Sequence, residues 1–292
     1  MGQTIACANQ KGGVGKTTTV VNLAAYLARS GERVLVVDLD PQGNATSGFG
    51  IDRAALATTL EDVVLGDAPI DEAIVDTVVE NCFVAPASVA LAGAEVELAG
   101  TNQRERRLTR VLEPITGEYD YILLDCPPSL GLLTVNALTA ADSVLIPTQC
   151  EYYALEGLSQ LIATLNLVRD NLNPALAIKG VVLTMYDART NLSADVAAEV
   201  RRHLGDAVFE TIIPRSVRLS EAPSFGLPIA LYSADSRGAL AYEALAAELR
   251  GRDGHATPLD GAGSGFADPR PPTIQTGGDL RDAPAMAVGG AP

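Results

Sequence analysis

The sequence predicts an α/β fold: a doubly wound, mostly parallel sheet with helices on both faces. Strand-like and helix-like segments alternate from residue 3 to about residue 250 of the 292-residue chain, which is the pattern of such a sheet. The strand-like segments are unbroken runs rich in Val, Ile and Leu, as expected when helices cover both faces of each strand. A glycine-rich loop joins the first strand to the first helix.

The individual elements follow from local patterns. After the glycine loop, apolar residues recur at helical spacing from Val20 to Ala28, and Gly31 ends that helix. Strands are predicted at residues 3–8, 33–38, 82–85, 121–125, 143–147, 179–185 and 208–213. Helices are predicted at residues 16–30, 60–65, 101–112, 134–140, 156–171, 193–204 and 238–250. Residues 1–250 therefore form one domain.

The composition changes after Arg250. Residues 251–292 hold 9 glycines and 6 prolines, 15 of 42 positions, with few large apolar residues. Such a segment cannot bury enough surface to order itself, so we expect a disordered tail. The tail lacks the basic amphipathic stripe of a membrane-surface helix. No apolar run approaches the roughly 20 residues that span a bilayer, and no signal peptide is visible, so a cytoplasmic protein without membrane contact is expected.

Composition also excludes several classes of site. The four cysteines lie far apart in the sequence, and only two histidines are present, so neither a zinc site nor a histidine-based catalytic triad is expected. The net charge of −15 does not decide whether the chain binds nucleic acid, because the charge is unevenly distributed. Residues 186–252 carry eight arginines against nine acidic residues, which leaves room for a local basic face.

Residues 11–18 read KGGVGKTT, and two of the three lysines of the chain lie in this segment. A strand, a glycine loop, a lysine, a hydroxyl residue and a helix in this order form a site for a nucleoside triphosphate, because backbone N–H groups and the helix N-terminus face the phosphates. Lys16 would reach the β- and γ-phosphates, and the Thr17 hydroxyl would ligate magnesium. The usual glycine six residues before the lysine is replaced by Gln10, and Lys11 is an additional lysine.

Acidic residues follow two of the predicted strands. Asp38 and Asp40 lie at the end of the second strand, and Asp125 ends the strand at 121–125. A carboxylate at such a strand end can hold the water shell of magnesium or orient an attacking water. A single aspartate there is as often a turn or cap residue. Three of them beside a phosphate loop favour the functional interpretation.

Five segments together resemble the deviant Walker-A ATPases of the MinD/ParA superfamily, and most closely the ParA/Soj chromosome-partitioning proteins. They are ANQKGGVGKTTT at 8–19, VDLDPQGNAT at 37–46, LDCPP at 124–128, LTMYDARTN at 183–191 and IPRSVRLSEAPS at 213–224. The resemblance covers residues 3 to about 250 and leaves out the tail. It implies a P-loop NTPase fold and an ATPase that uses ATP and Mg²⁺.

The resemblance also implies roles for individual residues. Lys11 would reach the nucleotide of a second subunit, and Gly12 would lie where the two subunits approach closely. Lys11, Lys16 and Asp40 would act in catalysis, with Asp40 positioning the attacking water. Thr17, Asp38 and Asp125 would support magnesium. The nucleotide would be held by Gly12, Gly13, Val14, Gly15, Lys16, Thr17 and Thr18 and, around the adenine, by Pro214 and Arg215.

The function implied is ATP-dependent chromosome partitioning. ATP would drive a face-to-face homodimer that binds double-stranded DNA without sequence preference, and a ParB/Spo0J-like centromere-binding protein would stimulate hydrolysis and release. Arg189 and Arg218 are the first candidates for phosphate contacts, with Arg215 and Arg201 as secondary ones. The protein would then lie in the cytoplasm, associated with the nucleoid. The alternative is a MinD-like spatial regulator of division, or another deviant Walker-A ATPase that does not act on DNA.

Overall fold

The computed structural model describes residues 2–66 and 68–253. Within these residues, eight strands form one sheet in the order β3-β4-β2-β5-β1-β6-β7-β8, and all neighbours are parallel except β3 and β4. The strands are β1 Gln3–Cys7, β2 Val34–Asp38, β3 Val75–Asp76, β4 Cys82–Ala85, β5 Tyr121–Asp125, β6 Ser143–Gln149, β7 Ala177–Tyr186 and β8 Val208–Pro214. Because β1 lies near the centre of the sheet, the loop after it opens at the point where the strand order reverses.

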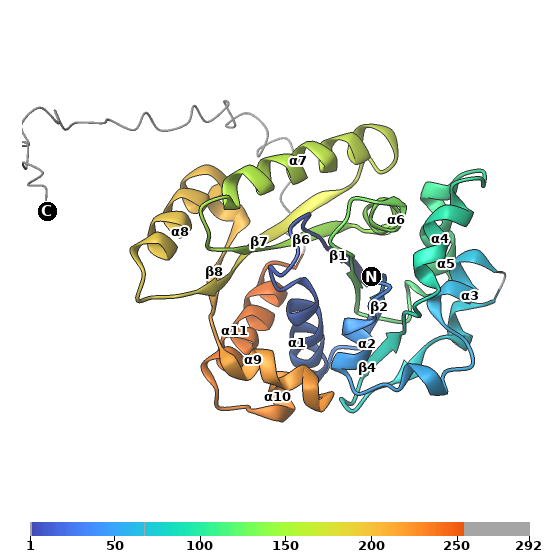
Figure 1. Cartoon of the computed structure of the whole chain (residues 1–292), viewed down its shortest axis with the longest axis horizontal. Coiled ribbons are helices and arrows are strands. Elements are labelled where there is room, and N and C mark those ends of the chain that lie inside the picture. Colours follow the sequence, from blue (N-terminus) through green and yellow to red (C-terminus); the bar gives the residue numbers. More distant parts are fainter. Residues whose placement is uncertain (1, 67, 254–292) are drawn as a thin grey trace, which may run out of the picture.

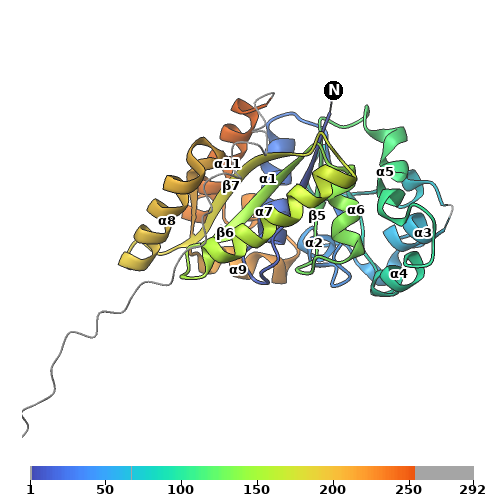
Figure 2. The same cartoon turned by 90° about the horizontal axis from the view of Figure 1, so that it is seen from above.

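Helices cover both faces of the sheet (Figures 1 and 2). One face carries α1 Lys16–Arg29, α2 Asn44–Gly48, α9 Val217–Glu221, α10 Ile229–Tyr232 and α11 Arg237–Gly251. The other carries α3 Leu60–Leu65, α4 Leu91–Leu98, α5 Arg107–Leu112, α6 Leu132–Ala140, α7 Ala154–Asn171 and α8 Asn191–Leu204. Short 3₁₀ turns join several of them. The predicted doubly wound α/β class is confirmed.

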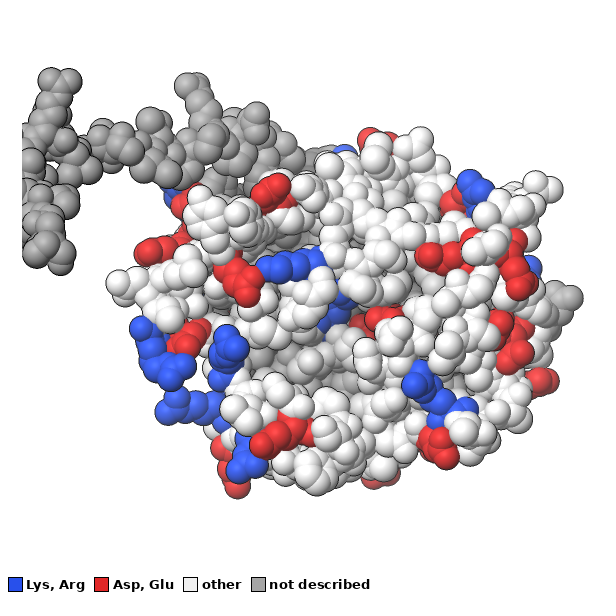
Figure 3. Space-filling model, viewed as in Figure 1, with Lys and Arg blue, Asp and Glu red and all other residues white. Residues whose placement is uncertain are grey.

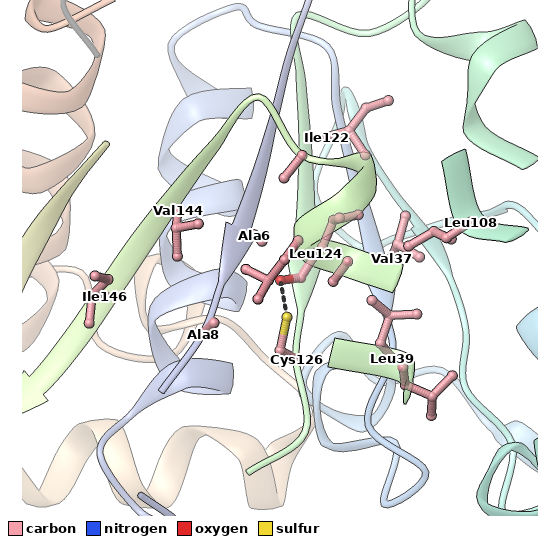
Figure 4. Packing of buried hydrophobic residues seen from close by; sticks show 14 of the residues in the cluster. Ala6, Ala8, Val37, Leu39, Leu108, Ile122, Leu124, Cys126, Val144 and Ile146 are labelled. Atoms are coloured by element: carbon pink, nitrogen blue, oxygen red, sulfur yellow. Dashed lines mark hydrogen bonds between the residues drawn. The ribbon is translucent and has the colours of Figure 1, made fainter. Parts of the chain in front are cut away.

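Each strand contributes to two cores, because successive side chains point to opposite faces. Ala6, Val37 and Leu124 belong to the core under α3–α8, which Figure 4 shows from close by. Their neighbours Cys7 and Val36 belong to the core under α1 and α11. The continuous apolar runs in the sequence are therefore explained by burial on both sides.

The structure contains elements that the sequence did not predict: β3, α2, α4, α9 and α10. All but one are five residues or shorter, too short for a periodic pattern to be visible. The helix predicted at 101–112 was too long, because α5 begins only at Arg107. Gln103 adopts a left-handed φ of 54°, and a 3₁₀ turn at 104–106 follows it.

The end of α11 is tied to the edge of the sheet where the strands begin. Lys179 is 2% exposed, and its Nζ donates to Asp253 Oδ1 and to Gln3 Oε1, both at 2.9 Å. The hydroxyl of Tyr121 donates to the same Asp253 carboxylate. The folded domain thus extends past the predicted boundary at residue 250, and the rest of the predicted tail, 254–292, lies outside the described residues. Within the described part, no helix has the length and apolar character that a bilayer crossing requires.

Two loops meet backbone to backbone beside α2. Gly50 and Gly226 both have left-handed φ angles, 75° and 63°. A Cβ on Gly226 would lie 2.6 Å from Gly50 Cα, and one on Gly50 would lie 2.9 Å from the Gly226 carbonyl oxygen. Neither position has room for a side chain. The contact joins the segment after α2 to the segment after α9.

Candidate nucleotide site

Two adjoining cavities open where the parallel strands end. One, of about 400 Å³, is lined by the glycine loop and the start of α1 together with Asp40, Gln42, Asn44, Pro128 and Met185. The other, of about 430 Å³, is lined mainly by the end of β8 and α9, including Pro214 and Arg215. Gly15, Thr18 and Met185 line both. The two cavities together form a groove with a polar, glycine-lined half and a second half beside β8.

The loop between β1 and α1 depends on glycine at two positions. Gly13 and Gly15 have φ angles of 75° and 89°, a region that side chains disfavour. Gly15 precedes α1 without a side-chain cap, and no acidic residue lies in the first turn, so the first N–H groups of the helix remain available to an anion. The hydroxyl of Thr184 on β7 donates to the Val14 carbonyl at 2.8 Å and fixes the loop from the opposite side.

The two lysines of the loop have different environments. Lys16 is 7% exposed, and its Nζ donates to the Lys11 carbonyl at 3.3 Å. Lys11 points outward, and its Nζ pairs with Glu151 just after β6, with 43% of each side chain exposed. Lys16 therefore faces the cavity, whereas Lys11 lies on its rim.

Gly12 differs from the other loop glycines. Its φ is not in the left-handed region, and the nearest atom to a Cβ placed there is the Pro128 Cβ at 3.9 Å. That distance is an ordinary van der Waals contact, so the chain itself has room for a side chain at this position. The glycine is not required by the fold of a single copy.

Three carboxylates gather beside Thr17. Asp38 and Asp125 are fully buried and lie side by side, paired in register on the parallel strands β2 and β5. Asp40 is 8% exposed. Burial raises the pKa of Asp38 to about 6, although hydrogen bonds from Thr46 and Asp40 lower it. Burial and the nearby Asp38 charge raise the pKa of Asp125 well above its usual range, and the Thr17 hydroxyl and Lys16 offset this only in part.

This donor set suits Mg²⁺. The Thr17 hydroxyl lies close to the buried Asp125 carboxylate, but neither carboxylate oxygen accepts a hydrogen bond of good geometry. A buried carboxylate without partners is destabilising unless a cation or its water shell lies beside it. Carboxylate and hydroxyl oxygens are the ligands that Mg²⁺ prefers, usually with several waters retained. Thr17, Asp38 and Asp125 therefore fit the cation that accompanies a nucleoside triphosphate.

The four candidate arginines are not all together. Arg189 is 86% exposed at the side chain and pairs with Asp187 at 2.7 Å, and Arg215 also lowers the pKa of Asp187. Arg218 on α9 pairs with Glu221 at 2.9 Å. Arg201 instead donates to the Phe209 and Glu210 carbonyls of β8. On the face shown in Figure 3, basic side chains are densest at the corner formed by the start of α8 and by α9.

Several residues of the site were not assigned from the sequence. Thr184 and Met185 lie in the segment 183–191, but nothing local reveals that one anchors the loop and the other lines both cavities. Met185 is also strained, with a φ of 51°. Glu151 pairs with Lys11, which is distant in the sequence. Thr46 bonds Asp38 through a buried hydroxyl. Of these four residues, only Glu151, a charged residue two positions after β6, carried a local signal.

The chain is similar to known proteins over most of its length. The family model described as AAA domain matches residues 2–178. The sporulation initiation inhibitor protein Soj of Bacillus subtilis is 60% identical over 249 residues, covering 85% of this chain and 98% of Soj. The chromosome partitioning protein ParA of Myxococcus xanthus is 56% identical, covering 87% and 89%.

A solved structure is similar over most of its length. Cobyrinic acid a,c-diamide synthase of Mycobacterium smegmatis with bound ADP and magnesium superposes with a TM-score of 0.77 at 40% identity, covering 88% of this chain and 98% of that one. The same protein has also been solved with a bound ATP analogue and magnesium. The chain belongs to the ParA/Soj family of chromosome-partitioning ATPases, deviant Walker-A enzymes of the MinD/ParA superfamily that use ATP with Mg²⁺.

Proposed function

We propose that this chain is a nucleotide-switched, DNA-binding dimer that partitions chromosomes. ATP with Mg²⁺ brings two copies together face to face, and the dimer binds double-stranded DNA without sequence preference. A ParB/Spo0J-like centromere-binding protein stimulates hydrolysis, which releases the DNA. The protein acts in the cytoplasm on the nucleoid.

The observation that carries the dimer is the rim formed by Lys11 and Gly12. A glycine at position 12 is not needed by one copy, because a Cβ there would meet only Pro128 at 3.9 Å. Close approach of a second backbone is the other physical reason for a residue without a side chain. Lys11 is held only by an ion pair with 43% of each side chain exposed. Such pairs are weak, so Lys11 can turn to the nucleotide of a second copy.

Different residues of the groove contact different parts of the nucleotide. The loop residues 12–18 hold the phosphates, and Pro214 and Arg215 lie along the adenine. Lys16 exchanges its contact with the Lys11 carbonyl, now 3.3 Å, for the β- and γ-phosphates. Mg²⁺ at Thr17, Asp38 and Asp125 would neutralise phosphate charge. Asp40, which lines the same cavity, orients the attacking water.

The DNA surface is the corner that carries Arg189, Arg215 and Arg218. All three are exposed, and each can exchange an intrachain carboxylate or water for a phosphate. Arg201 contributes less, because its guanidinium is already bound to two β8 carbonyls. Contacts of this kind carry no sequence information, so binding weakens steeply with salt.

The experiment that tests the proposal is DNA binding by the full chain to a duplex of arbitrary sequence, with and without ATP and Mg²⁺, across a salt titration. We expect binding only with both. Gly12→Val should keep ATP binding but lose dimerisation and DNA binding. Gly117→Val, at a position where a Cβ meets nothing within 4 Å, should keep both dimerisation and DNA binding. Binding of the duplex without nucleotide would refute the switch.

Further variants separate the steps. Lys16→Ala should abolish ATP binding, and Asp40→Ala should trap an ATP-bound dimer visible by size exclusion. Arg189→Glu should still dimerise but lose DNA, while Arg110→Glu, an exposed arginine on α5, should have no effect. An equal loss of DNA binding in Arg189→Glu and Arg110→Glu would show that the corner of α8 and α9 is not the DNA surface.

A further inference from the structure

We propose that Thr46 is a positioning residue for hydrolysis: it fixes the Asp38 carboxylate and, through it, the loop that carries Asp40. The inference rests on the proposed role of Asp40 in orienting the attacking water. Thr46 lies at the third position of α2 and is completely buried.

Asp38 bonds both ends of this loop. Its Oδ2 accepts hydrogen bonds from the Thr46 N–H at 2.8 Å and from the Thr46 hydroxyl at 2.7 Å. Its Oδ1 accepts one from the Asp40 N–H at 3.2 Å. One buried carboxylate thus closes residues 40–46 into a ring. The position of Asp40 is set before any nucleotide arrives, as preorganised catalysis requires.

The Thr46 hydroxyl also reaches a third segment. It accepts a hydrogen bond from the Ala87 N–H, just after β4, at 3.2 Å. The hydroxyl therefore donates to Asp38 and accepts from Ala87 at once, and among small side chains only Thr and Ser can do both. Without it, the Ala87 N–H would be buried without an acceptor, which is costly.

The environment of Asp125 differs from that of Asp38, and the difference indicates different roles for the two buried carboxylates. Neither oxygen of Asp125 accepts a hydrogen bond of good geometry, whereas Asp38 has three donors. Asp125 is therefore the more open toward a cation, while Asp38, besides its proposed support of Mg²⁺, holds the loop in place. Loss of the Thr46 hydroxyl should loosen Asp40 while the phosphate loop and Asp125 stay as they are.

The test compares Thr46→Val, which keeps the shape and removes the hydroxyl, with Thr46→Ser, which keeps the hydroxyl. Thr139→Val on α6 is the matched control, since that hydroxyl is also buried but bonds only the Val135 carbonyl of its own helix, at 2.7 Å. In Thr46→Val we expect kcat for ATP hydrolysis to fall by about 10- to 100-fold. Affinity for a fluorescent ATP analogue should stay unchanged, and Thr46→Ser should restore hydrolysis.

Amide hydrogen exchange supplies a readout that does not depend on turnover. The amides of Asp40, residue 46 and Ala87 should be protected in the nucleotide-free wild type, and all three should exchange faster in Thr46→Val but not in Thr46→Ser. Rapid exchange of these amides in the wild type overturns the proposal even if the variant fails to fold. Wild-type hydrolysis by Thr46→Val overturns it as well.

The proposed function fails in a different way. If Asp40→Ala hydrolyses ATP normally, the role given to Asp40 is wrong. The exchange result then shows separately whether Thr46 holds the loop.

Discussion

The two edges of the sheet bury charge in opposite ways. Where the strands begin, Lys179 is buried, and both of its bonds, to Asp253 and Gln3, are 2.9 Å long. Where the strands end, Asp38 and Asp125 are buried side by side without an ion-pair partner, and Asp125 accepts no hydrogen bond of good geometry. The first edge is complete in one chain. We expect the second to be neutralised by the cation and the phosphates of the proposed nucleotide complex.

This difference separates a structural cluster from a binding site. A buried charge that is paired and hydrogen-bonded belongs to the fold, whereas two buried like charges raise each other's pKa and destabilise the free protein. Function explains why such a site persists. Stability measurements on matched variants should therefore change sign between the two edges.

The largest effect is expected at the structural edge. Asp253→Asn removes the counter-ion of a buried lysine. We expect it to lower the free energy of unfolding by about 3 kcal/mol. The loss should lie somewhat below that of a fully buried ion pair, because 32% of the Asp253 side chain is exposed. Urea unfolding measures this. Lys179→Met/Asp253→Asn should recover most of the loss, and a double variant as unstable as Asp253→Asn would contradict the ion-pair explanation.

At the nucleotide edge the sign reverses. Asp125→Asn removes a buried carboxylate whose pKa is raised by burial and by Asp38. We expect the nucleotide-free protein to gain about 2 kcal/mol in unfolding free energy. The same variant should bind an ATP analogue more weakly in Mg²⁺, measured by fluorescence titration. A destabilised Asp125→Asn would remove the contrast between the edges.

The pH dependence should reveal the titration of Asp38, whose charge also raises the pKa of Asp125. Because its pKa in the fold, about 6, lies above the usual 3.8, the protonated form is favoured by folding, and the stability it supplies is lost as pH rises through 6. Relative to Asp38→Asn, the nucleotide-free wild type should lose about 1 kcal/mol between pH 5 and pH 7. Equal slopes for the two proteins in urea unfolding would show that Asp38 does not titrate in this range.

The smallest effect is expected at the rim. Glu151→Gln breaks the pair with Lys11, but 43% of each side chain is exposed, so we expect a change below about 0.5 kcal/mol in unfolding free energy. Thermal unfolding checks this against Asp253→Asn. A loss as large as that of Asp253→Asn would mean that the Lys11 pair belongs to the fold.

The sequence predicted the parts of the site that are contiguous. Residues 11–18 and the aspartates at two strand ends are recognised because strand, loop and helix follow one another locally. The supports of these residues come from elsewhere: Thr184 bonds Val14 across 170 residues, and Glu151 bonds Lys11 across 140. Such contacts depend on the strand order of the sheet, which no local pattern specifies. The short helices α2 and α9 were missed for the related reason that packing, not periodicity, stabilises them.

The contact between Gly50 and Gly226 has a mechanical consequence. Gly50 follows the segment that carries Asp40 and Thr46, and Gly226 follows the segment that carries Arg218. With Cα and carbonyl atoms meeting directly, no rotamer change can absorb a displacement of one segment toward the other. The contact therefore leaves little room for either backbone to move toward the other. It links the loop that carries Asp40 directly to the proposed DNA surface.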